Sequence, residues 1–196
     1  MAELMLIAED DAQERLVGAL VQRIVREEGH PVALRVRSNF GGLPMVLKEL
    51  RSFARQVERG LIDPPDLVVV ALDANCHGAE SRRQSIDEQA GEALRDRLIR
   101  AVPDPHIERW YLLDGAAFKT VLGQGCGAPD LKCEKDRYKR LLNDAIRAAG
   151  VEPLLGGVEY AEDLAANIDL RRAGRSDAAF EAFVSEMRAS ARRLGR

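Results

Sequence analysis

The chain lacks three features that would place it at once in a functional class. Its 29 Lys and Arg are outnumbered by 32 Asp and Glu, so no overall positive charge indicates nucleic acid binding. No apolar run approaches the ~20 residues that a membrane-spanning helix needs. Only 3 cysteines are present, and we see no secretory signal peptide. We therefore expect a cytoplasmic protein with free thiols and no membrane segment.

What remains is an ordinary globular composition. The 196 residues are 46% hydrophobic and 31% charged, enough to form a core of their own. No internal repeat or low-complexity tract interrupts the chain. We expect an α/β core over residues 1–122, with a helical C-terminal extension over residues 123–196 packed on it.

Apolar patterns predict alternating strands and helices. Short apolar or alternating runs indicate strands, and stripes with i, i+4 spacing indicate helices. The expected strands cover residues 4–8, 31–38, 67–72 and 106–113, and the expected helices cover about 10–28, 45–60, 85–101, 115–122, 134–149 and 177–194. This alternation predicts an α/β fold of TOPRIM or Rossmann-like type, a parallel sheet with helices on both faces.

Acidic residues follow two of the expected strands. Glu9 ends the first strand and Asp73 ends the third. Right-handed crossovers bring the carboxyl ends of parallel strands to one edge of the sheet, where ligands bind in such folds. We therefore expect Glu9 and Asp73 to lie together although they are distant in sequence.

Oxygen ligands at this edge point to a metal. Glu9, Asp73 and Asn75 offer two carboxylates and an amide oxygen, which suit Mg²⁺ or Mn²⁺. Asp10 and Glu80 lie close enough in sequence to add negative charge. The alternative is that acids at strand ends cap helices and interact with solvent.

Two further groups extend the candidate site. Glu108, in the segment "HIERWYLLD", is an acid in an expected apolar strand, where burial is costly unless it is paired or bound to metal; the alternative is the wet face of an edge strand. Lys132, Lys135 and Lys139 are candidates for contacting a phosphodiester backbone, or else form the solvated face of a helix.

The strand-end acids resemble the pattern of the TOPRIM family. That pattern is a glutamate after the first strand and Asp-x-Asp after the third, matched here by Glu9, Asp73 and Asn75. Residues 107–114, 135–142 and 160–187 are also similar to small TOPRIM-like proteins encoded beside ATPases in anti-phage cassettes, relatives of overcoming-lysogenization-defect nucleases.

This resemblance implies an Mg²⁺-dependent nuclease, the effector of a defence system. Glu9 would be a metal ligand or general base, Asp73 and Asn75 metal ligands, and Glu108 a further catalytic acid. It also implies an ATPase partner of AAA or ABC type, and it leaves homo-oligomerisation open.

Two positions depart from the family pattern. Asp10 stands where a glycine usually follows the glutamate, and Asn75 removes one negative charge from the metal site. Asp10 or Glu80 would have to replace that charge. If neither does, the resemblance implies a non-catalytic binding subunit of an ATPase complex.

A second resemblance is to response-regulator receivers. "LIAEDDAQERL" resembles their acidic metal pair, and "PDLVVVALD" resembles the strand that presents a phospho-acceptor, here Asp73. The interval between Asp11 and Asp73 is longer than in receivers, and the Met-Pro-Gly and Lys-Pro motifs are absent. The last 60 residues also have no counterpart in a receiver, so this is the less favoured interpretation.

Overall fold

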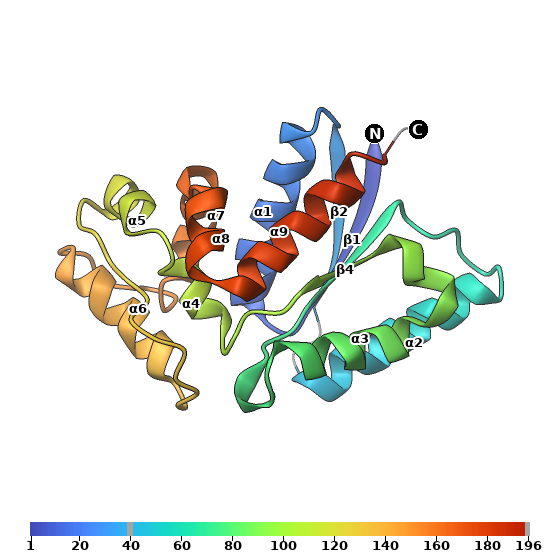
Figure 1. Cartoon of the computed structure of the whole chain (residues 1–196), viewed down its shortest axis with the longest axis horizontal. Helices are drawn as coiled ribbons and strands as arrows, with labels where there is room; N and C mark the ends of the chain where they lie inside the picture. Colours follow the sequence, from blue (N-terminus) through green and yellow to red (C-terminus); the bar gives the residue numbers. More distant parts are fainter. Residues whose placement is uncertain (39–40, 195–196) are drawn as a thin grey trace.

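A computed structural model describes residues 1–38 and 41–194 and has a parallel sheet at its centre (Figure 1). The four strands are β1 (Ala2–Ala8), β2 (Val32–Ser38), β3 (Leu67–Ala71) and β4 (Leu98–Ala101), in the order β2-β1-β3-β4. All three pairings are parallel. The expected α/β fold with a parallel sheet and C-terminal helices is confirmed.

Helices cover both faces of this sheet. In chain order the α-helices are α1 (Asp11–Glu27), α2 (Leu43–Glu58), α3 (Ala79–Leu94), α4 (Ile107–Tyr111), α5 (Gly115–Leu122), α6 (Arg137–Ala148), α7 (Ala161–Asn167), α8 (Leu170–Ser176) and α9 (Ala178–Ala191). Within the described residues, the short 3₁₀ turns are η1 (Asn75–His77), η2 (Arg95–Arg97) and η3 (Val158–Tyr160). No described helix is long and apolar enough to cross a membrane.

Alternating side chains of the strands build two cores. In β1, Leu4 and Leu6 face the core under α1 and the C-terminal helices, whereas Met5 and Ile7 face the core under α2 and α3. This is the period of two expected for a strand buried on both sides. Figure 1 shows α2 and α3 on one side of the sheet and α1 and α9 on the other.

The fourth strand lies earlier than the sequence predicted. The expected strand over residues 106–113 is wrong, because Ile107–Tyr111 forms helix α4. The expected helix over residues 85–101 instead ends at Leu94, and Leu98–Ala101 pairs with β3. This strand is short and carries a charged residue, Arg100, so the segment resembled a charged helix face. In the structure Arg100 pairs with Asp87 and Glu186.

The cysteines also differ from expectation. Cys76 and Cys133 form a disulfide across a separation of 57 residues, so the expectation of three free thiols is wrong for these two. Cys126 is free. Cys76 lies in η1, after β3, and Cys133 lies just before α6. The bond therefore ties the carboxyl edge of the sheet to the segment that leads into α6.

Candidate active site at the carboxyl edge of the sheet

The structure brings Glu9 and Asp73 into contact. Ala8 of β1 is in register with Ala71 of β3, so the residues that follow these strands emerge side by side. The backbone N–H of Asp73 donates to Glu9 Oε2 over 3.4 Å, although the two residues are 64 positions apart. The parallel topology thus places two carboxylates at one edge.

Three protein groups contact the Asp73 carboxyl group. Gln13 Nε2 and the backbone N–H of Ile107 donate to Oδ1, at 2.9 and 3.0 Å. His106 Nδ1 lies 3.2 Å from Oδ2. The same Gln13 side chain accepts from the backbone N–H of Glu9 at 3.1 Å, and it is fully buried. Gln13 therefore connects the ends of β1 and β3.

A cavity of about 270 Å³ opens beside Asp73. Acidic, basic and aromatic side chains meet in it. The lining residues are Asp73, Asn75, His106, Glu108, Lys135, Asp136, Tyr138 and Lys139. Five of the residues proposed from the sequence therefore share one cavity, and Glu9 contacts Asp73 at its side.

Backbone conformation is unusual at two points of this cavity. Asn75 and Asp136 have φ of 51° and 56°, and among the described residues they are the only ones other than glycine with positive φ. Asn75 is held there by its backbone N–H, which donates to the Pro105 carbonyl at 2.9 Å. Such conformations cost free energy and often mark functional sites.

Burial shifts the acids of this edge toward their neutral forms. Burial raises the pKa of Asp73 to about 7, against the pull of its hydrogen bond with His106. Burial also raises the pKa values of Glu9 and Glu108. The hydrogen bond to Asp73 raises the pKa of His106. The site therefore holds protons at neutral pH that isolated carboxyl groups would release.

We predict that the stability of the wild-type protein falls as the pH rises, and that it falls much less in Asp73→Asn. Folded Asp73 keeps its proton up to about pH 7, whereas the unfolded acid releases it near 3.8, so stability falls across this interval. His106, raised by the same partner, acts in the same direction. Thermal unfolding in EDTA at several pH values measures how steeply stability falls with pH.

The variant has a matched control. The amide oxygen that Asp73→Asn introduces can still accept from Gln13 and Ile107, so the hydrogen bonds made by Oδ1 are preserved. Asp96→Asn changes an exposed acid in η2, just before β4 at the opposite edge of the sheet. Asp96→Asn should keep the steep pH dependence of the wild type, and an equally steep dependence in Asp73→Asn would contradict the assignment.

Four predicted site residues lie in other surroundings than the sequence indicated. Asp10 caps α1, where its side chain accepts from the Gln13 backbone N–H at 2.9 Å, although its charge still raises the pKa of Asp73. Glu80 is exposed in the first turn of α3 and does not line the cavity. Lys132 is 72% exposed and lies 3.9 Å from Asp130. Lys135 precedes α6 rather than lying in a helix.

Sequence reasoning missed His106 and Gln13. His106 was passed over because the fourth strand was expected to begin there, which hid its place after β4. His77, which follows Asp73 more closely in the sequence, is exposed in η1 and does not line the cavity. Gln13 carried a detectable signal, since it is an amide on the apolar stripe of α1 with Leu16 and Val17.

The donor set fits a hard divalent cation in its chemistry. Glu9, Asp73 and Glu108 offer oxygen ligands, and a cation would compensate the charges that burial now disfavours. Asn75 Nδ2 donates to the Asp73 carbonyl at 3.4 Å, and its Oδ1 has no hydrogen bond within the described residues. In those residues no three His, Cys, Asp or Glu side chains are already gathered around one point.

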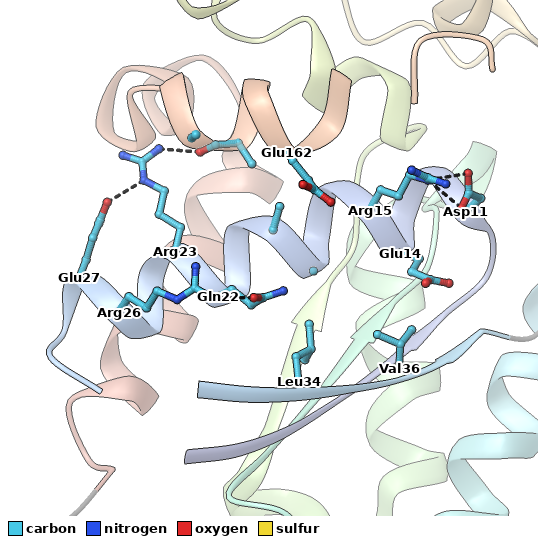
Figure 2. A pocket seen from close by; sticks show the side chains of 14 residues that line it. Asp11, Glu14, Arg15, Gln22, Arg23, Arg26, Glu27, Leu34, Val36 and Glu162 are labelled. Carbon is cyan, nitrogen blue, oxygen red and sulfur yellow. Dashed lines mark hydrogen bonds and ion pairs between the residues drawn. The ribbon is translucent and has the colours of Figure 1, made fainter. Parts of the chain in front are cut away.

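A larger cavity, of about 960 Å³, lies elsewhere (Figure 2). It is bounded by α1, β2 and α7, and most of its charged groups are satisfied within the protein. Arg15 pairs with Asp11 at 2.9 Å and Arg23 with Glu27 at 2.7 Å. Arg23 also donates to the carbonyls of Ala165 and Ile168. The acids proposed from the strand ends do not line this cavity, so the smaller cavity is the better candidate.

Comparisons with known proteins add no relative. No protein-family model, no curated protein and no solved structure matches the chain.

Proposed function

We propose that this protein is a Mg²⁺- or Mn²⁺-dependent phosphodiesterase of TOPRIM type that hydrolyses DNA or RNA. One observation carries the proposal. Glu9, Asp73 and Glu108 follow three different strands and meet at one edge, and Lys135 and Lys139 line the same cavity as Asp73 and Glu108. The carboxylates can bind a cation, and the lysines beside them can bind an anion. This combination suits a phosphodiester substrate.

Glu9 and Asp73 would hold the ion, with the amide oxygen of Asn75. The ion, when bound, polarises the phosphoryl group and neutralises developing negative charge. Because Asn75 replaces an acid, another carboxylate must supply the missing charge. Glu108 lines the cavity, whereas Glu80 is exposed outside it and Asp10 is engaged as a helix cap, so Glu108 is the better source.

The remaining cavity residues suit substrate handling. Hydrolysis adds water to phosphorus and breaks a P–O bond, and the leaving alkoxide then takes a proton. His106 lines the cavity and is held in place by Asp73, so it can keep a proton for that step. Lys135 and Lys139 would hold and orient the phosphate.

We expect Mn²⁺ to bind to the wild-type protein and to support cleavage of DNA or RNA. Calorimetric titration measures the binding, and gels of labelled DNA and RNA measure the cleavage. Glu9→Gln should abolish the binding heat, because it removes one of the few charged ligands while preserving the acceptor for the Asp73 N–H.

The control for this variant is Glu58→Gln. Glu58 is exposed at the C-terminus of α2, and its replacement should leave the titration unchanged. No Mn²⁺ binding in the wild type would favour the non-catalytic binding subunit. Acid-labile phosphate on Asp73 after treatment with a small phosphodonor would favour the receiver.

We further propose a cytoplasmic role with an ATPase partner of AAA or ABC type in anti-phage defence. The support is the resemblance to TOPRIM-like proteins encoded beside ATPases. The net charge of -3 also suggests that a partner supplies part of the grip on nucleic acid. Cleavage assays with and without the ATPase encoded nearest to this protein test it, and stimulation is the expected result.

A further inference from the structure

The segment over residues 131–136 carries Lys132 and Lys135 and passes the edge of the sheet at which Glu9 and Asp73 lie. It forms no helix or strand that could hold it there. All six residues are exposed. Apart from contacts with Cys76, every hydrogen bond and ion pair that the structure gives for them stays within residues 130–140, such as Arg140 to the Lys135 carbonyl at 3.1 Å. A segment with so few buried contacts opens at little cost.

The exception is the bond between Cys133 and Cys76. Cys76 directly follows Asn75, which lines the candidate site. The disulfide therefore anchors the segment to the turn beside Asp73 and keeps Lys135 in the cavity lining. In Figure 1 the loop before α6 and the turn before α3 both reach the lower side of the view.

Both sulfur-bearing residues are exposed. An exposed disulfide is open to thiolate attack and belongs to the labile rather than the purely structural kind. Cys126 differs, since it is half-buried and burial raises its pKa to about 12, which keeps its thiol protonated. The chain thus contains one accessible redox pair and one unreactive cysteine.

We propose that Cys76 and Cys133 form a reversible thiol–disulfide site that controls whether the segment 131–136 is held beside the carboxylates. The oxidised form is the one that places Lys135 for phosphate binding. Its consequence for nucleic acid rests on the proposed function; its effect on the segment does not.

The chemistry balances with a dithiol as reductant. A thiolate of the dithiol attacks one sulfur of the Cys76–Cys133 bond, giving a mixed disulfide and a protein thiolate. The second thiol of the reductant then displaces the other cysteine. The protein gains two electrons and two protons, and the reductant becomes a cyclic disulfide. A low-molecular-weight disulfide reverses the exchange.

Limited proteolysis tests the order of the segment. Trypsin should cut after Lys132 and Lys135 at least about tenfold faster in dithiol-reduced protein than in oxidised protein, because the crosslink limits local opening. Cys76→Ser and Cys133→Ser should be cut at the fast rate in either condition. Cys126→Ser should behave as the wild type. Equal rates in oxidised and reduced wild type would overturn the proposal.

Binding of labelled single-stranded DNA and RNA tests the functional consequence. Reduction should weaken binding by about tenfold, the effect of losing one positioned cationic contact. Mn²⁺ affinity should not change, because Gln13, Ile107 and His106 hold Asp73 independently of the segment. Faster proteolysis with unchanged nucleic acid affinity would overturn control of the site. Faster proteolysis with no nucleic acid binding in either state would instead refute the proposed function and keep the redox site.

Discussion

Replacing Asp177 by alanine is expected to lower the free energy of unfolding by about 3–5 kcal/mol, because it leaves a buried guanidinium without its partner. Asp177 and Arg109 are each only 4% exposed, and their side chains form an ion pair. The carboxylate also caps α9 by accepting from the Phe180 backbone N–H at 2.7 Å. Loss of this cap adds about 1 kcal/mol. The sum is a large fraction of the ~5–15 kcal/mol that stabilises a typical domain.

Two other variants separate the contribution of the buried ion pair from that of the helix cap. Asp177→Asn keeps the cap acceptor and loses the charge, so it should be less destabilised than Asp177→Ala. Adding Arg109→Met to Asp177→Ala should recover part of the loss, because no unpaired buried charge remains. Asp163→Ala, which changes an exposed residue of α7, should stay within about 0.5 kcal/mol of the wild type. Urea denaturation measures all four; a loss below about 1 kcal/mol for Asp177→Ala would show that the pair is not buried in solution.

The pair matters for the site because of its neighbours. Arg109 follows Glu108 in α4, and its Nε donates to the Asp130 carbonyl at 3.0 Å. Asp130 in turn accepts from Arg137 at 2.8 Å, at the start of α6. The Arg109–Asp177 pair thus joins α4 to α9, and the contacts of Asp130 extend this link to α6. Together they hold the helix that carries Glu108.

The first half of the fold could be predicted because local pattern and tertiary role agree there. Residues 4–8 of β1 and the whole of β3 are continuous apolar runs, and both are buried on two faces of a central sheet. The apolar stripe of α1 is equally regular and packs on the same sheet. The carboxyl edge followed from this topology alone, which is why Glu9 and Asp73 were expected together.

Residues 98–113 could not be predicted, because tertiary contacts override local preference there. The segment "IERWYLL" is largely apolar, with two aromatic residues and one β-branched residue, and therefore resembles a strand. In the structure it is a buried helix, and Trp110 packs on Phe180 and Phe183 of α9, with ring centroids 5.0 and 5.5 Å away. These partners are about 70 residues away in the sequence.

The candidate site was predictable only where it depends on strand ends. Glu108 was selected for the right reason, burial of an acid, but on the wrong element. His106 became visible only once β4 was placed before it. The Cys76–Cys133 pairing had no local signal, because three cysteines allow three pairings and the chosen one spans 57 residues.

Asp73→Asn is expected to reduce phosphodiester hydrolysis by at least about a thousandfold, which corresponds to about 4 kcal/mol of transition-state stabilisation. The variant removes the negative charge that would hold the cation and leaves the hydrogen bonds from Gln13 and Ile107. The loss should appear in kcat rather than in nucleic acid affinity, because Lys135 and Lys139 are unchanged. Single-turnover cleavage with Mn²⁺ measures it.

Stability separates this loss from unfolding. Because burial raises the pKa of Asp73 to about 7, the ionised acid destabilises the metal-free protein above that pH, and the neutral asparagine does not. The inactive variant should therefore be at least as stable as the wild type at about pH 8 in EDTA. Added Mn²⁺ should stabilise the wild type and not the variant, since only the wild type offers an ionised ligand there. Wild-type activity in Asp73→Asn, with Asp96→Asn as the exposed control, would remove Asp73 from the catalytic centre.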